Sequence, residues 1–281
     1  MGPQFLSIEQ SALVINSLLR KIILRITTDR AILHCFFSMA FGTKSIPRVD
    51  KIFGPGNRYV TEAKMEMAGK GVAIDMPAGP SEVIVLADET ANPAFVAADL
   101  LSQAEHGSDS QVVLITTSSK ILSQTLEEME RQSATLSRKT FVDKTLANST
   151  AILVNSMFEA MTISNRYAPE HLILAVAKPE QLAQEVKSAG SVFLGHYSPE
   201  SAGDYSSGTN HTLPTSRFAR SWSGITTLSF MKSITFQQLC KEGISAISSA
   251  TAALARAEGL EAHARAIEIR DEFLNSAKKQ S

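Results

Sequence analysis

From about Met39 to Gly195, short apolar runs alternate with stretches in which apolar residues recur at helical spacing. This alternation constrains the fold most strongly, because neighbouring parallel strands need long connections, which are usually helices. It predicts an α/β fold with a mostly parallel sheet, helices on both faces and right-handed crossovers. The predicted strands are 49–53, 72–75, 82–87, 111–116, 150–154, 171–176 and 191–195. The predicted helices are 60–67, 93–106, 120–132, 157–166 and 179–188.

The two ends of the chain do not follow this alternation. Residues 1–34 lack its rhythm, and the apolar run at 12–26 is interrupted by charged residues. That run favours an amphipathic helix over a membrane span or a secretory signal, with an organelle-targeting segment as a further alternative. Residues 198–223 are rich in Ser, Thr and Gly and predict loops, whereas 244–278 predict a helical tail that breaks near Gly259.

The composition excludes several classes of protein. With 281 residues, 44% of them hydrophobic and 20% charged, the chain is typical of a soluble globular protein of one or two domains. A formal net charge of −1 argues against a broad nucleic-acid surface. Two cysteines predict a reducing compartment, by default the cytoplasm, and exclude a Cys-rich zinc site. We expect neither a nucleic-acid nor a membrane partner.

Gln103 and His106 are three residues apart at the end of a predicted helix, which places them on one face. A neutral imidazole is a good zinc ligand, and an amide oxygen is a rarer one. By itself, the pair favours a capping or surface role.

Glu170 and His171 are adjacent at the start of a predicted strand, where both can line the edge of the sheet. A carboxylate and an imidazole there can act as two separate bases. The alternative is an exposed turn pair, because open α/β folds usually bind ligands at the carboxyl ends of their strands.

Three further places carry candidate residues. Asp204 lies in a glycine-containing loop, where it can bind a metal or form an Asx-turn. Glu258 and His263 flank the break in the helical tail, where each also reads as a solvated residue. The turn 54–57 lies between a strand and a helix, a geometry that suits a phosphate, although it is also a plain tight turn.

From about Met39 to its C-terminus, the chain resembles histidinol dehydrogenase almost continuously. The resemblance rests on long strings: AFGTKSIP at 40–47, KIFGPGN at 51–57, IDMPAGPSE at 74–82, DLLSQAEHG at 99–107, YAPEHL at 167–172, GSVFLG at 190–195 and SPESAGDYSSGTNHTLPT at 198–215. It implies an enzyme with one Zn²⁺ per subunit that uses two NAD in succession. Such an enzyme oxidises L-histidinol through an aldehyde to L-histidine, the last step of histidine biosynthesis.

The resemblance also implies roles for particular residues. The implied zinc ligands are Gln103, His106, Asp204 and His263. The implied proton acceptors are Glu170 and His171, and Asn57 falls at a cofactor-contacting position. The implied substrate-binding residues are Ser81, Gln103, His106, His171, Asp204, Glu258 and His263. A homodimer is implied too, in which the tail of each subunit completes the site of its partner.

We therefore expect incomplete Rossmann-like parallel-sheet domains followed by a C-terminal helical tail. The expected parts are an atypical segment at 1–37, a remnant of one Rossmann-like domain at 38–81, a main α/β domain with the metal and catalytic residues at 82–225, and a helical dimerisation tail at 226–281. Residues 1–34 are not expected to match the long N-terminal portion of the family, which carries much of the cofactor site. The chain as given is then expected to be weakly active or inactive and prone to aggregate.

Two alternatives remain open at this point. One is a truncated remnant that binds zinc or a partner chain without turnover. The other is a zinc hydrolase that uses Glu170 as the base for metal-bound water, which would turn over without NAD.

Overall fold

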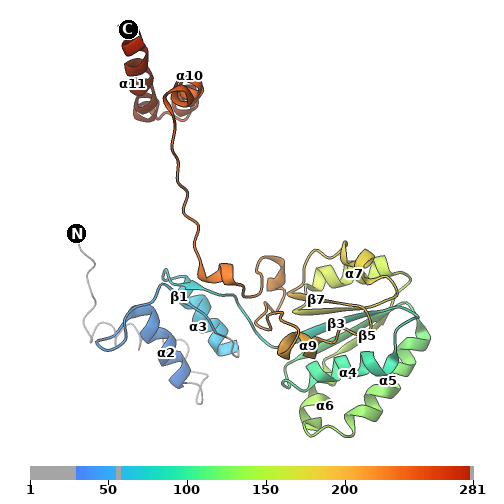
Figure 1. Ribbon diagram of the computed structural model, residues 1–281. Helices are drawn as coiled ribbons and strands as arrows, with labels where there is room; N and C mark the ends of the chain where they lie inside the picture. The colour runs from blue at the N-terminus through green and yellow to red at the C-terminus, as the bar shows by residue number, and fades with distance from the viewer. Residues whose placement is uncertain (1–29, 55–57, 279–281) are drawn as a thin grey trace. The chain divides into compact units, whose positions relative to one another are not determined.

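The computed structural model describes residues 30–54 and 58–278. The chain divides between Phe230 and Met231 into two compact units, which are described one at a time (Figure 1). The predicted helix at 12–26, together with residues 55–57 of the predicted turn, lies outside the described residues.

The first unit contains a five-stranded, fully parallel sheet with strand order β5-β4-β3-β6-β7. Its strands are β3 (Glu82–Ala87), β4 (Gln111–Thr116), β5 (Thr150–Leu153), β6 (His171–Ala175) and β7 (Ser191–Leu194). In the central strand, Val83 is in register with Val112 of β4 on one side and with His171 of β6 on the other. The predicted parallel sheet is thereby confirmed, and β3 and β4 have the predicted bounds.

Helices cover both faces of this sheet (Figure 1). Those on one face are α4 (Pro93–Ala104), α5 (Ser119–Ser133) and α6 (Lys139–Ala147); those on the other are α7 (Met157–Tyr167) and α8 (Pro179–Ala183). Alternate residues of β3 supply the two cores: Val83 and Val85 pack toward α4, and Ile84 and Leu86 pack toward α7. Burial on both faces explains why these strands read as continuous apolar runs.

Three helices differ from the prediction. Helix α4 ends at Ala104, so His106 lies in the turn that follows the helix rather than on its face. Helix α8 stops at Ala183 instead of 188, because the side-chain oxygen of Asn165 accepts the backbone N–H groups of Lys187 and Ser188. Helix α6 was not predicted, although its buried Val142 and Thr145 are three residues apart and face the core.

Two other helices lie in segments that were expected to be irregular. Helix α2 (Arg30–Phe41) begins within the segment that lacked a rhythm. Helix α9 (Glu200–Tyr205) interrupts the predicted loop region, which otherwise contains only the short 3₁₀ turn η1 (Phe218–Arg220); a second such turn, η2 (Thr227–Phe230), follows the region. Helix α9 has only six residues, and serine and glycine residues lie both within it and directly after it. Its sequence therefore shows no apolar repeat from which a helix could be predicted.

A second, smaller sheet precedes the main one in the chain. Strands β1 (Lys51–Ile52) and β2 (Ala73–Ile74) pair in parallel, with α3 (Arg58–Ala68) between them in sequence. Their apolar cluster includes Phe37 of α2, which is fully buried. The buried carboxylate of Asp75 pairs with Lys64 at 2.5 Å and accepts the backbone N–H of Gly54 at 2.8 Å. The start of the predicted turn at 54–57 is therefore anchored to β2.

The second unit is a helical hairpin of α10 (Lys241–Ala257) and α11 (Glu261–Lys278). Gly259 has a φ of 77°, a left-handed conformation that favours glycine and ends α10. This confirms the helical tail and its break. Within the portion of the chain that the structure describes, no helix has both the length and the apolar character needed to cross a bilayer.

Candidate functional site

The first predicted pair lies at the amino ends of two neighbouring central strands. His171 is the first residue of β6, and Glu170 comes just before it. Helix α7 ends at Ala168, whose φ of 57° is unusual for a residue with a side chain. This left-handed residue turns the chain directly from α7 into β6, and it leaves Glu170 and His171 only 6% and 4% exposed. The site therefore does not use the carboxyl ends of the strands, the usual place for ligands in such sheets.

The backbone of one residue, Glu82, holds both side chains of this pair. The backbone N–H of Glu82, the first residue of β3, donates to Oε2 of Glu170 at 2.9 Å. The backbone carbonyl of the same residue lies 3.2 Å from Nδ1 of His171. Because a carbonyl only accepts, this contact requires a proton on Nδ1 and leaves the lone pair on Nε2.

The free nitrogen of His171 faces the rest of the site. Its Nε2 is buried and has no hydrogen-bond partner within the described residues, and it lies 3.9 Å from Oδ1 of Asp204. A buried, unpaired imidazole nitrogen is costly, so such an atom points to a function. Burial also lowers the pKa of His171 to about 4, with the Glu82 carbonyl opposing that shift. At neutral pH the imidazole is therefore uncharged and able to accept a proton.

Glu170 is shifted in the opposite direction. Burial raises its pKa to about 8, the bond from the Glu82 N–H lowers it in part, and the negative charges of Glu82 and Asp204 raise it further. Without a cation nearby, this carboxyl group is largely protonated at neutral pH. A bound metal ion would favour the charged form.

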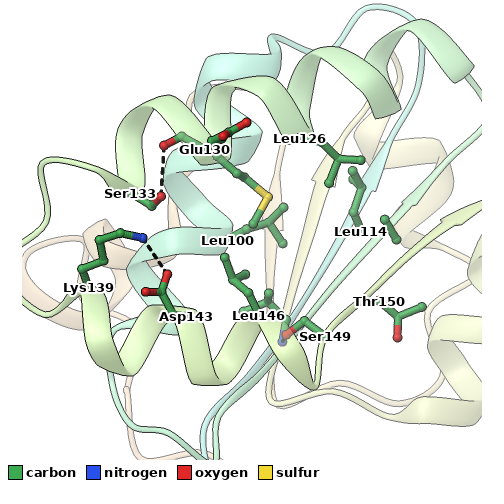
Figure 2. A pocket seen from close by; sticks show the side chains of 13 residues that line it. Leu100, Leu114, Leu126, Glu130, Ser133, Lys139, Asp143, Leu146, Ser149 and Thr150 are labelled. Atoms are coloured by element: carbon green, nitrogen blue, oxygen red, sulfur yellow. Dashed lines mark hydrogen bonds and ion pairs between the residues drawn. The ribbon is translucent and has the colours of Figure 1, made fainter.

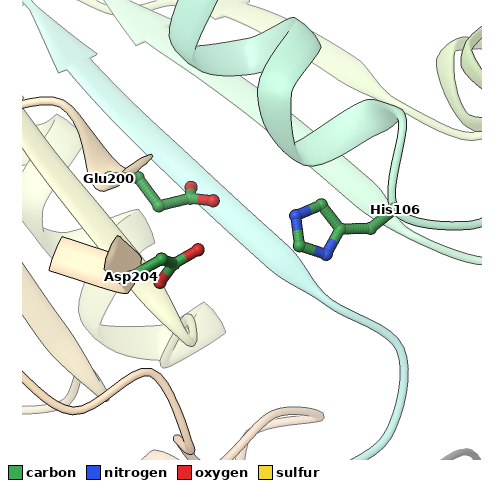
Figure 3. A group of neighbouring side chains, drawn as sticks. All are labelled: His106, Glu200 and Asp204. Atoms are coloured by element: carbon green, nitrogen blue, oxygen red, sulfur yellow. The ribbon is translucent and has the colours of Figure 1, made fainter. Parts of the chain in front are cut away.

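A group of possible metal ligands lies beside this pair. One ligand atom from each of His106, Glu200 and Asp204 lies within 4.8 Å of the other two. Figure 3 shows that the three side chains converge, His106 from the turn after α4 and the two carboxylates from α9. An imidazole nitrogen with carboxylate oxygens is a donor set that suits zinc. The residues present therefore fit the zinc that the family resemblance implied.

Close packing sets the position of α9. Gly203 lies against the ring of Phe193 in β7, and a Cβ atom at this glycine would approach the ring within 2.5 Å. Only glycine allows this approach, which presses the helix against the sheet. Glu200 and Asp204 are four residues apart on α9 and therefore share a face.

Gln103 joins the group through Glu200. In the orientation that satisfies its hydrogen bonds, the amide nitrogen of Gln103 donates to both carboxylate oxygens of Glu200, at 2.5 and 2.9 Å. The same nitrogen is 3.2 Å from Nδ1 of His171. We assign the Nδ1 proton to the Glu82 carbonyl, because the amide has two shorter contacts with Glu200.

The sequence matches the histidinol dehydrogenase family over residues 20–271. The chain belongs to the histidinol dehydrogenase family. Histidinol dehydrogenase of Bacteroides fragilis (strain YCH46) is 57% identical over 233 residues, which are 83% of this chain and 54% of that protein. The enzyme of Pseudoalteromonas translucida (strain TAC 125) is 54% identical over 241 residues, 85% of this chain and 56% of that protein. The crystal structure of histidinol dehydrogenase from Elizabethkingia anophelis aligns with a TM-score of 0.84 at 55% identity, covering 86% of this chain and 56% of that one.

The chain thus spans about half the length of the curated histidinol dehydrogenases that it matches. The family match begins at residue 20. Residues 20–34 of the segment that was expected to be atypical thus lie within the family match.

Among the residues that the histidinol dehydrogenase resemblance implied, the structure gathers one set in the first unit. These are Gln103, His106, Glu170, His171 and Asp204, and Ser81 precedes Glu82 at the same end of β3. Glu258 and His263 lie in the second unit, at the end of α10 and in α11, and both are exposed. Asn57 lies outside the described residues.

Sequence reasoning missed two contributors to the site. Glu200 is 1% exposed, and its separation of four residues from Asp204 was a signal only if 200–205 was taken as a helix. The backbone N–H and C=O of Glu82 had no signal in the sequence, because a backbone contact depends on strand register and not on residue type.

A separate pocket lies between α4, α5, α6 and the edge strand β5, with a volume of about 350 Å³ (Figure 2). Its wall is mostly apolar; of its charged residues Glu130, Lys139 and Asp143, the last two pair with each other at 2.7 Å. None of the predicted site residues lines it. The chemistry is therefore assigned to the amino ends of β3 and β6.

Proposed function

We propose that this chain oxidises L-histidinol to L-histidine through L-histidinal, with zinc and two NAD, as the last step of histidine biosynthesis. The observation that carries the proposal is the buried Glu170–His171 pair, held by the backbone N–H and C=O of Glu82 beside a cluster of metal ligands. Family membership supports the same activity.

In this proposal, zinc is held by Gln103, His106, Asp204 and His263, and when bound it holds and polarises the substrate. NAD, when bound, accepts the hydride in each of the two oxidations. Ser81 and Glu258 contribute to substrate binding, together with the zinc ligands and His171. Asn57 contacts the cofactor.

The two bases have separate tasks. His171 takes the hydroxyl proton of the substrate at Nε2 while the carbinol hydrogen leaves as hydride, which gives the aldehyde. Glu170 then takes a proton from the water that adds to the aldehyde carbon, which gives a hydrate for the second oxidation. The low pKa of His171 suits the first task, because the imidazole is already neutral. The raised pKa of Glu170 predicts that the second task improves as the pH rises toward about 8.

We further propose a homodimer in which the α10–α11 hairpin of one subunit supplies Glu258 and His263 to the site of the other. The exposure of both residues within the hairpin supports this, since ligand side chains must be reachable. A second candidate is a chain that binds zinc or a partner chain without turnover. The group formed by His106, Glu200 and Asp204 supports it, because zinc binding needs only the metal ligands.

The test is NADH formation by the purified chain with L-histidinol, zinc and NAD, followed by ultraviolet absorbance. The variant His171→Asn is expected to lose about 10²–10⁴-fold in rate, the usual contribution of a positioned base. The matched control is His196→Asn, since His196 contacts Thr90 and not the site. Zinc binding without turnover in the parent chain would favour the second candidate, and turnover without NAD would contradict both.

A further inference from the structure

Glu200 is a buried carboxylate that neither the sequence nor the proposed mechanism uses. It is 1% exposed, and no described lysine or arginine pairs with it. Its charged neighbours are mostly acidic, since Asp204, Glu170 and Asp99 all raise its pKa after burial, to about 9. A carboxyl group buried among acidic neighbours lowers the stability of the fold unless its hydrogen bonds compensate for the lost contact with water.

Its hydrogen bonds are made to one side chain. Both oxygens of Glu200 accept from the amide nitrogen of Gln103, at 2.5 and 2.9 Å. With the Glu200 carboxylate ionised, the form that a bound zinc favours, rotating that amide by half a turn would place its oxygen against two carboxylate oxygens, with no donor between them. Glu200 therefore decides which end of the amide faces it and directs the amide oxygen away from itself.

The orientation matters because an amide can bind a metal ion only through its oxygen. Gln103 is fully buried in α4, so its side chain has little freedom to reach a metal in any other way. We propose that Glu200 is a positioning residue that fixes the Gln103 amide with its oxygen available to zinc, an inference that rests on the proposed metal site. Glu200 thus acts through Gln103 and is not itself the ligand.

The competing arrangement has Glu200 as a direct ligand, since its carboxylate lies within the group formed with His106 and Asp204 (Figure 3). The contacts of Glu200 favour positioning, because each of its oxygens already accepts a bond from Gln103.

A double-mutant cycle on the full chain separates the two arrangements. Zinc affinity is measured by competition with a chelating dye for the parent, Glu200→Ala, Gln103→Ala and the double variant. Glu200→Ala is expected to weaken zinc binding by about 10–100-fold, the usual effect of removing a residue that orients a ligand. The double variant is expected to bind no more weakly than Gln103→Ala alone, because Glu200 has no effect without the amide.

Two further measurements support the cycle. Glu200→Gln keeps one acceptor oxygen and is expected to recover part of the affinity that Glu200→Ala loses. Unfolding of the same four proteins in a chelator tests the contact without metal, and it should show the same coupling between the two positions. The control is Asp143→Ala, whose carboxylate pairs with Lys139 at the separate pocket and not at this site.

The outcomes are distinct. Unchanged affinity in Glu200→Ala, or losses that simply add in the double variant, would overturn the inference; additive losses would make Glu200 a direct ligand. A parent chain that binds no zinc would overturn both this inference and the proposed function. Coupling between the two positions in a chain that does not oxidise histidinol would support the inference and overturn the proposed function alone.

Discussion

The parallel sheet and the helical hairpin differ in how much of their apolar surface is buried. All six residues of β3 are buried, and the sheet has an apolar core on each face. Among its described residues, the hairpin buries only Ser248, Ala252 and Ala264. It leaves large apolar side chains exposed, including Leu254 at 69% and Phe273 at 71%. The sheet can therefore position site residues with its own packed core, whereas the exposed apolar side chains of the hairpin need a further protein surface to cover them.

The largest expected effect sharpens this difference in packing. Ile84→Ala in β3 should lower the free energy of unfolding by about 2–5 kcal/mol at every protein concentration, because it leaves a cavity in a closed core. Leu254→Ala should change it by less than about 0.5 kcal/mol where the chains are separate, and by more where they associate. Urea unfolding at several protein concentrations measures both. A large, concentration-independent loss in Leu254→Ala would break the comparison.

The next effect asks whether the two regions share one metal ion. If the sheet and the hairpin each supply a zinc ligand, His106→Asn and His263→Asn should weaken zinc binding to a similar degree. The loss should be at least the ~10–100-fold that follows removal of a residue that only orients a ligand. Dye competition on the full chain measures this, with His196→Asn as the control. Unchanged affinity in His263→Asn would mean that the hairpin contributes no ligand.

A smaller effect concerns pH in the sheet. Burial raises the pKa of Glu170 to about 8 and that of Glu200 to about 9, so the folded, metal-free protein holds protons that the unfolded chain releases. Stability should therefore fall as the pH rises from about 6.5 to 9. Below that window, the lowered pKa of His171 acts in the opposite direction, because the unfolded chain then binds the extra proton. Thermal unfolding in chelator should show this slope, and Glu200→Gln should flatten it; an unchanged slope would contradict the assignment.

The smallest effect belongs to the hairpin and has the opposite sign. Arg256 forms hydrogen bonds with Glu261 and Glu268 and lowers the pKa of both carboxyl groups. These pairs contribute above the ordinary carboxyl pKa, and their contribution is lost as the pH falls below it. Because they are exposed, Arg256→Ala should change stability only slightly, and added salt should remove the difference. Hydrogen exchange of the hairpin amides at low and high salt measures it.

The sequence predicted the sheet well, for a physical reason. Strands β3 and β4 are buried on both faces, so their residues form uninterrupted apolar runs whose ends are visible. Short helices were harder: α9 has six residues and no apolar repeat, and α8 is cut short by the hydrogen bonds of a distant asparagine. Such competition between local and tertiary bonding leaves no trace in the local sequence.

The site was predicted in part. Gln103, His106 and Asp204 were identified from the sequence strings shared with the histidinol dehydrogenase family. The structure gathers them around Glu200, which accepts hydrogen bonds from Gln103 and lies in one group with His106 and Asp204. Glu200 was missed because it lies in a stretch that reads as loop.

The two backbone contacts of Glu82 affect how this site can be studied by mutation. The N–H and C=O of Glu82 orient Glu170 and His171, and no side chain takes part in those two bonds on the β3 side. An alanine scan is therefore blind to them, since every replacement at position 82 except proline keeps both groups. A map of mutational sensitivity would identify Glu170 and His171 and miss the backbone groups of Glu82 that orient them.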